Sequence, residues 1–215
     1  EIVSAQQYEL AGGDNGTQPG PTEIIGSNAL EPPTGMFALD NVDLFNILCI
    51  PRAADLTDTN RNAVYSHAIS YCEDHRAMMI VDIPSGTDTL TDMLDLMADY
   101  EQAGLRSENA AIFYPRVVQG DPTDDFRARD FGASGTMAGV WARTDTARGV
   151  WKAPAGIEAG LEGVSELDAQ VNDGQNGVLN PLGINALRTF PVYGTIAWGS
   201  RTLAGADALA SEWAY

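Results

Sequence analysis

A hydroxyl-rich turn, two histidines and several aspartates are the residues of this sequence whose types could support catalysis. Ser134, Gly135 and Thr136 come directly before a helical pattern, and a hydroxyl placed there could act as a nucleophile if a histidine took its proton. Such chemistry needs an acid, a base and a nucleophile within hydrogen-bond reach of one another. The chain order Asp, His, Ser is available in Asp43 or Asp55, then His67, then Ser134.

The local context of these residues argues against a working triad. The run from Ser134 to Gly139 resembles the serine loop of subtilisin-like proteases, in which Gly-Thr-Ser-Met-Ala opens a helix, but Thr136 stands where the nucleophile would be. His67 lies in the middle of a predicted helix and is not followed by the Gly-Thr of that family. We interpret the segment as a helix start at which Gly135 permits close packing on a sheet. The sequence therefore predicts no catalytic residues and no enzymatic activity.

The histidines and cysteines lack the spacing of a metal site. His67 and His75 are eight residues apart on one predicted helix, about 12 Å along its axis, which is too far for one ion. Cys49 and Cys72 form neither a metal motif nor a disulfide framework, and we expect two buried free thiols. We predict neither a metal nor a cofactor.

The end of the second predicted strand is a place where a ligand could bind. Asp82 ends that strand and the Ser-Gly-Thr run at 85–87 follows at a helix N-terminus, which is where anions bind in α/β proteins. The segment has no glycine-rich fingerprint and no Walker lysine. A capping box formed by Ser85 and Asp88 accounts for the same residues.

The charge balance excludes two classes of partner. Thirty acidic residues oppose twelve basic ones, which gives a net charge of -18. Surfaces that bind nucleic acids or anionic membranes need clustered Lys and Arg instead. No apolar run approaches the ~20 residues that cross a bilayer. We therefore expect no nucleic-acid partner and no membrane insertion.

The elements that must position these residues follow a β-α-β-α-β pattern. Three apolar runs, each stopped at or near a proline, predict strands at 44–50, 77–83 and 110–114. The first is nearly continuous, so we expect it to be buried on both faces. Amphipathic segments between them predict helices at about 58–74 and 88–103. This alternation favours adjacent parallel strands with helices packed on the sheet.

The flanking regions are less regular. Residues 1–40 are rich in Gly, Pro, Thr and Asn and are predicted to be a loop-rich N-terminal segment, with residues 41–215 as the main domain. Residues 133–146 are predicted to be helical. The Asn-Pro pair at 180–181 is expected to cap and begin a short helix, and residues 194–198 are expected to form a further strand at the sheet edge.

Three short motifs in the last third of the sequence occur in a fixed order. They are VWKAPAG at 150–156, LNPLGIN at 179–185 with RTFP at 188–191 behind it, and WGSRTL at 198–203. Together they resemble the tail sheath proteins of contractile phage tails and of related contractile injection systems. The resemblance is dense over about 135–213 and faint before that.

This resemblance implies a structural protein without an active site. The implied fold is α/β, a mostly parallel sheet flanked by helices, as in the subtilisin-like sheath core domain. The implied function is that of a subunit that polymerises as helical, stacked hexameric rings around an inner tube and contracts to drive the tube through a target envelope. Its implied partners are further copies of itself with six-fold symmetry, the inner tube protein, and baseplate and terminator proteins.

The resemblance also implies assembly in the bacterial cytoplasm, as part of a phage tail or a tail-like injection particle. It does not separate a phage tail from an extracellular or cytoplasmic injection system. Family members normally continue past Tyr215, so we expect a fragment whose terminal arms and C-terminal part are missing. Two alternatives remain open: a degenerate subtilisin-like serine hydrolase and a doubly wound ligand-binding domain.

A cluster of charged and aromatic residues is the candidate subunit interface, because Arg and Trp are favoured as interface anchors. The candidates are Arg143, Asp145, Arg148, Trp151 and Lys152, together with Arg188 and Arg201 from the family motifs. The alternative interpretation is a solvated helix face and its exit loop. For Arg188 and Arg201 it is pairing with carboxylates at the edge of the core.

Overall fold

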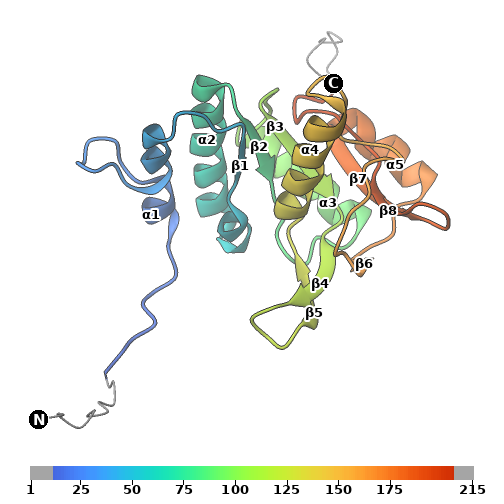
Figure 1. Cartoon of the computed structure of the whole chain (residues 1–215), viewed down its shortest axis with the longest axis horizontal. Coiled ribbons are helices and arrows are strands. Elements are labelled where there is room, and N and C mark those ends of the chain that lie inside the picture. The colour runs from blue at the N-terminus through green and yellow to red at the C-terminus, as the bar shows by residue number, and fades with distance from the viewer. Residues whose placement is uncertain (1–11, 206–215) are drawn as a thin grey trace, which may run out of the picture.

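A five-stranded sheet with helices on both faces forms the centre of the molecule (Figure 1). The computed structural model describes residues 12–205. The strand order is β1-β2-β3-β7-β8. These strands are β1 (Ile47–Cys49), β2 (Met78–Val81), β3 (Ala110–Tyr114), β7 (Ile184–Phe190) and β8 (Gly194–Ala197).

The first four strands of this sheet run parallel. Ile80 of β2 lies opposite Ala111 of β3, and Ile112 of β3 lies opposite Ile184 of β7. The three strands predicted from apolar runs are therefore adjacent and parallel, which confirms that prediction. β8 pairs antiparallel with β7 at the end of the sheet, and its position at the edge is confirmed.

A second, smaller sheet is antiparallel throughout. Its order is β5-β4-β6, formed by β4 (Val117–Asp121), β5 (Arg127–Phe131) and β6 (Glu166–Leu167). The β4–β5 hairpin projects from the body of the molecule at the bottom of Figure 1. The α/β class is thus confirmed, while the strand pairings of residues 12–205 are mixed, three parallel and three antiparallel.

Four α-helices provide most of the helical residues of the described chain: α2 (Asp58–His75), α3 (Leu90–Gln102), α4 (Ser134–Arg148) and α5 (Asp173–Leu179). The first three confirm the helices predicted at about 58–74, 88–103 and 133–146. A capping box of Thr89 and Asp92 begins α3, since each side chain accepts a hydrogen bond from the other's backbone N–H. The box predicted at Ser85 and Asp88 is therefore wrong by four residues.

Alternating residues of the parallel strands divide the core between the two faces of the sheet. Met79 of β2 packs in the cluster that includes α2 and α3, whereas its neighbour Ile80 packs in the cluster of α4. On the α4 side, Met137 and Val140 are buried in the same cluster as Phe113. Both faces of β2 and β3 are thus covered, as their continuous apolar sequences predict.

The first strand departs from the prediction. β1 spans three residues, all of them partly exposed, and Leu44 is 74% exposed. The reason is position: β1 ends the sheet and pairs with β2 alone. An apolar run at an edge strand therefore has the same sequence pattern as one in the middle of a sheet.

One further local prediction is corrected. The N-terminal segment predicted to be loop-rich includes two short helices, α1 (Pro21–Ile25) and the 3-10 helix η1 (Gly35–Asn41). Asn180 is the C-cap of α5 and the first residue of the 3-10 helix η3 (Asn180–Leu182), so it does not cap a helix N-terminus. The cap of α5 is Asn172, whose side chain accepts from Gln175 N.

Within residues 12–205, no helix combines the length and the apolar composition that crossing a bilayer requires.

A further 3-10 helix, η2 (Pro51–Asp55), connects β1 to α2.

Candidate functional site

The hydroxyl-rich turn begins α4, where it is engaged by a carboxylate. Ser134 is 1% exposed, and both its backbone N–H (2.8 Å) and its hydroxyl donate to Asp82 at the end of β2. The ring of His67 faces Ala63 O instead, at 2.8 Å. Asp82, not a histidine, is thus the partner of the serine. The pair fixes the start of α4 on the sheet and does not form the geometry of a nucleophile and its base.

Gly132, and not Gly135, is the glycine that allows close packing at this point. No atom lies near the position that a side chain at Gly135 would occupy, whereas a Cβ at Gly132 would overlap the carboxylate of Asp82. The prediction for Gly135 is wrong because Gly135 is on the exposed side of the helix start. Gly132 comes before the helix, where the chain passes directly over the end of β2.

The predicted ligand position at the end of β2 is occupied by the protein itself. Besides holding Ser134, Asp82 accepts a hydrogen bond from Tyr65 OH at its backbone carbonyl, 2.8 Å away. Thr87 donates to Pro84 O at 3.0 Å. Burial raises the pKa of Asp82 above its ordinary value of 3.8, although the hydrogen bonds from Ser134 and the charge of Arg116 oppose that shift.

The two cysteines are free thiols, one buried and one partly buried. Burial raises the pKa of Cys49 to about 11 and that of Cys72 to about 12, so both are protonated at neutral pH and poorly nucleophilic. Among the described residues, no three His, Cys, Asp or Glu side chains gather as ligands for a metal ion.

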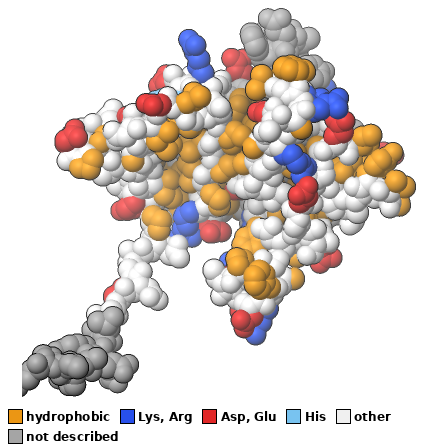
Figure 2. All heavy atoms as spheres, viewed as in Figure 1, with side chains coloured by type: hydrophobic (Ala, Val, Ile, Leu, Met, Phe, Trp, Pro, Cys, Tyr) orange, Lys and Arg blue, Asp and Glu red, His pale blue; other side chains and the backbone are white. Residues whose placement is uncertain are grey.

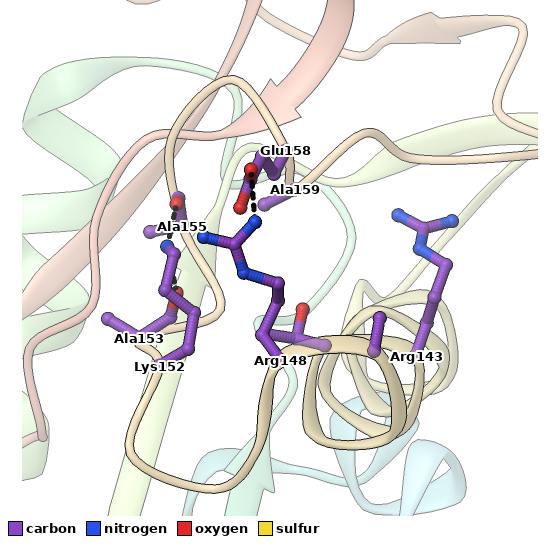
Figure 3. Close-up of a pocket in the computed structure, with 9 residues that line it drawn as sticks. Arg143, Arg148, Lys152, Ala153, Ala155, Glu158 and Ala159 are labelled. Atoms are coloured by element: carbon purple, nitrogen blue, oxygen red, sulfur yellow. Dashed lines mark hydrogen bonds and ion pairs between the residues drawn. The ribbon is translucent and has the colours of Figure 1, made fainter.

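Three of the predicted interface residues surround one pocket at the C-terminal end of α4 (Figure 3). We call it the α4 pocket: a cavity of about 280 Å³ lined by Arg143, Arg148, Lys152 and Glu158, with Ala147, Ala153, Ala155 and Ala159 among the other lining residues. Arg148 pairs with Glu158 at 3.1 Å. Figure 3 shows Arg148 and Lys152 pointing toward the 153–159 loop, with Arg143 on the far side of Arg148.

Arg143 and Lys152 use their donors differently. Arg143 pairs with Glu162 at 2.6 Å and donates to Gly160 O, so it ties α4 to the following loop. Lys152 donates to the carbonyls of Ala153 (2.8 Å) and Ala155 (3.3 Å). Within residues 12–205, no carboxylate lies within ion-pair distance of this ammonium group, so its charge is not compensated locally.

A larger groove lies beside this pocket, at the amino ends of the parallel strands. Its volume is about 720 Å³, and Asp145, Trp151, Lys152 and Arg201 are among its lining residues. Trp151 is 84% exposed, at the rim. The structure thus brings six of the seven predicted interface residues to two adjacent cavities, with Lys152 lining both.

Arg188 lies elsewhere. It is on β7, where its guanidinium pairs with Asp173 at 2.8 Å, donates to Val171 O at 3.0 Å, and lies 5.0 Å from the ring centre of Phe190. These contacts join β7 to the start of α5. They match the interpretation of Arg188 as a residue that pairs with a carboxylate at the edge of the core.

Comparisons with known proteins give a consistent result among solved structures. The PVC sheath complex of an extracellular contractile injection system, in its contracted state, matches at 28% identity over 82% of this chain and 44% of its own, with a TM-score of 0.63. The contracted helical sheath of the anti-feeding prophage matches at 32% over 82% and 43%, with a TM-score of 0.60. The six-fold symmetrised baseplate of the anti-feeding prophage matches at 32% over 82% and 42%, also at 0.60.

This chain belongs to the contractile tail sheath family. It spans less than half the length of the solved chains that it matches. No model of a protein family matches it, and a search of curated proteins finds no match.

The sheath motifs that suggested the family are in contact with one another. Asn185, from the second motif, is fully buried. Its side-chain amide nitrogen donates to Ile112 O (3.1 Å) and Arg201 O (2.8 Å), and its side-chain oxygen Oδ1 accepts from Arg201 N (2.7 Å). Gly199 packs against it so closely that a Cβ there would lie 2.6 Å from Asn185 Oδ1. The second and third motifs of this sheath chain therefore form one structural unit at the amino end of β7.

Sequence reasoning missed several residues that shape the site. Glu158 and Glu162 pair with Arg148 and Arg143, and together they hold the loop that forms the wall of the α4 pocket. The sequence does contain a signal for these ion pairs, because two glutamates four residues apart follow a helix that carries arginines at its C-terminal end. Asp82 was noted for its place after a strand, but nothing in the sequence connects it to Ser134, 52 residues away.

Proposed function

We propose that this chain is a structural subunit of a contractile tail sheath. It would polymerise as helical, stacked hexameric rings around an inner tube and contract to drive that tube through a target envelope. The observation that carries the proposal is the likeness to contracted sheath structures, at TM-scores of 0.60 and 0.63 and identities of 32% and 28%.

The proposal extends to the domain organisation. Residues 41–215 would form the subtilisin-like sheath core domain, preceded by the N-terminal segment 1–40. The parallel β1-β2-β3-β7 arrangement, with helices on both faces, supports this assignment. The terminal arms of the family would then hold neighbouring subunits together by adding strands to their sheets.

We also propose that the cluster predicted from the sequence is a subunit interface. The support is physical: Val150 and Trp151 are each more than 80% exposed beside two cavities rimmed by charged residues. Large exposed apolar side chains within a polar rim are typical of protein interfaces. Arg201 contributes backbone contacts with Asn185 beside these cavities. Arg188 lies apart from them and would support the interface indirectly, through its hold on α5.

Six-fold self-association, an inner tube, a baseplate and a terminator are the proposed partners, with assembly in the bacterial cytoplasm. The likeness to baseplate and sheath structures of the anti-feeding prophage supports self-association and the baseplate. We propose no enzymatic activity, because Ser134 is buried against Asp82 and the matched solved structures are parts of contractile injection systems.

Negative-stain electron microscopy of the natural polypeptide that contains these 215 residues tests the proposal. We expect hollow, striated tubes of uniform diameter. A fluorophosphonate probe added to the same preparation should leave Ser134 unlabelled. Dispersed particles of fixed size together with labelling of Ser134 would instead favour the hydrolase alternative.

A further inference from the structure

The tip of the β4–β5 hairpin, residues 122–126, is an exposed feature of the surface with several internal hydrogen bonds. Phe126 is 75% exposed. The tip is nevertheless held by hydrogen bonds to Asp121, whose side chain accepts from Thr123 N (2.8 Å) and whose backbone carbonyl accepts from Phe126 N (2.8 Å). The hydrogen bond from the Thr123 hydroxyl helps to hold the pKa of Asp121 below its ordinary value. This tip is therefore preorganised, which reduces the entropy that it would lose on binding.

The backbone of the hairpin tip is unusual for its residues. Asp125 and Phe126 are consecutive residues in the left-handed region, with φ of 49° and 57°. A bulky residue such as phenylalanine rarely adopts this conformation, and such positions often occur at functional sites. A solvent-exposed turn has no packing requirement for an aromatic side chain at this place.

The charges of the hairpin leave one carboxylate without a partner. Asp124 pairs with Arg127, and Asp121 pairs with Arg129, each at 3.3 Å. No ion pair within residues 12–205 involves Asp125. The hairpin tip thus presents one uncompensated anion next to one exposed aromatic ring.

The α4 pocket has the complementary character. Its alanines offer apolar surface. Of its three cations, Arg148 and Arg143 pair with Glu158 and Glu162, which leaves Lys152 as the one without an ion pair within residues 12–205. Lys152, which lacks a carboxylate partner among the described residues, is the single lysine of a chain whose net charge is -18. The pocket is therefore a local basic site on an acidic molecule, with room beside the cations for an aromatic side chain.

The hairpin tip and the α4 pocket lie at opposite ends of the molecule. In Figure 1, the hairpin projects at the bottom, while α4 rises from the end of β5 toward the top. The 15 residues of α4 separate the two ends by about 22 Å along the helix. Figure 2 shows acidic, basic and apolar side chains gathered at the lower projection. A contact between two different surfaces at opposite ends repeats from copy to copy, and it generates an open helical assembly when the rotation between copies does not close a ring.

We propose that the β4–β5 hairpin tip of one copy inserts into the α4 pocket of the next copy, with Asp125 pairing with Lys152 and Phe126 covering the alanines. This inference rests on the proposed function, since it names one of the contacts through which the sheath would assemble. It commits to a second copy of this chain as the occupant, because the unpaired anion and the unpaired cation belong to the same sequence.

A charge-swap experiment tests this contact in the natural polypeptide that contains the chain. Sedimentation velocity gives the concentration at which half the protein assembles for Asp125→Lys, for Lys152→Glu and for the double variant. We expect each single substitution to raise that concentration at least about tenfold, because two like charges then face each other. The double variant should return to within about threefold of the wild type. Phe126→Ala should also weaken assembly.

The matched control is Asp95→Lys, which makes the same charge change at an exposed position of α3. An effect of Asp125→Lys no larger than that of Asp95→Lys would overturn the inference while leaving tube formation, and so the proposed function, intact. If Lys152→Glu weakens assembly but Asp125→Lys does not, the pocket holds another occupant and the inference is wrong. If the wild type does not assemble at any concentration, the proposed function fails first. Unfolding midpoints of all variants show whether they are folded.

Discussion

At the scale of single residues, Asp82 is a buried carboxylate that joins two elements far apart in the sequence. It is 2% exposed, lies at the end of β2, and accepts two hydrogen bonds from Ser134 at the start of α4. A buried carboxylate is stabilised only when donors surround it, and here the donors belong to an element more than 50 residues away. Asp82 therefore fixes the helix that ends at the α4 pocket.

Replacing this carboxylate gives a graded prediction. Asp82→Ala removes the acceptor and leaves the buried donors of Ser134 unpaired, so we expect a loss of about 2–4 kcal/mol in the free energy of unfolding. Asp82→Asn keeps an acceptor and should lose less than half as much. Urea denaturation of both variants measures the difference. Equal losses for Ala and Asn would mean that the hydrogen bonds to Ser134 are not what stabilises the helix start.

The same residue predicts a pH dependence. Burial raises the pKa of Asp82 above 3.8, so the folded protein binds this proton more tightly than the unfolded chain does. Its contribution to stability is then fully present below pH 3.8 and is lost as pH rises through the raised pKa. The free energy of unfolding of the wild type relative to Asp82→Asn should therefore fall as pH rises from about 4. A difference that rises with pH would contradict this effect of burial on Asp82.

At the scale of elements, the join between β7 and the 198–203 segment depends on a glycine. Gly199→Ala would place a Cβ 2.6 Å from Asn185 Oδ1 and 2.9 Å from Asn185 Cα, and a fully buried residue cannot move aside cheaply. We expect a loss of about 1–3 kcal/mol in the free energy of unfolding. Gly139→Ala is the matched control, because no atom lies within 4 Å of its Cβ position inside α4. It should instead stabilise by about 0.5–1 kcal/mol. Thermal unfolding of both variants checks the pair, and similar destabilisation by both would refute it.

Three of the parallel strands, the edge strand β8 and the helices α2, α3 and α4 could be predicted from the sequence because their signals are local. The fourth parallel strand, β7, was not predicted. Apolar runs ended by proline at β2 and β3, with amphipathic stretches between them, define strands and helices within a few residues. The edge position of β1 could not be predicted, since the order of strands is set by tertiary packing. The same holds for the α4 pocket: its basic residues were identified, but Glu158, Glu162 and the alanines approach them only when the chain after α4 folds back.

At the scale of the whole molecule, charge is the main obstacle to self-association. A net charge of -18 means that copies repel one another unless opposite charges are brought together at the contacts. The two cavities at the end of α4 gather five of the twelve basic residues of the chain, namely Arg76, Arg143, Arg148, Lys152 and Arg201. Such a concentration of cations on an acidic body would allow assembly while discouraging contacts elsewhere.

Substitution of the exposed tryptophan at these cavities should change assembly without changing folding. Trp151 is 84% exposed, so Trp151→Ala should change the free energy of unfolding by no more than about 0.5 kcal/mol. If it anchors a subunit interface, the same substitution should raise the concentration needed for assembly by at least about thirtyfold. Val192→Ala, an equally exposed apolar residue in the β7–β8 turn, is the control. Sedimentation velocity measures the assembly concentration and urea denaturation measures the free energy of unfolding. An unchanged assembly midpoint would show that Trp151 is not part of the interface.

A helical reconstruction, by electron cryomicroscopy, of whatever the natural polypeptide assembles into would show whether this chain is a sheath subunit. We expect a hollow tube built from stacked rings of six subunits, with the five-stranded sheet of this chain recognisable in each subunit and the end of α4 against a neighbouring copy. A closed oligomer, or a tube in which both cavities at the end of α4 face solvent, would contradict it.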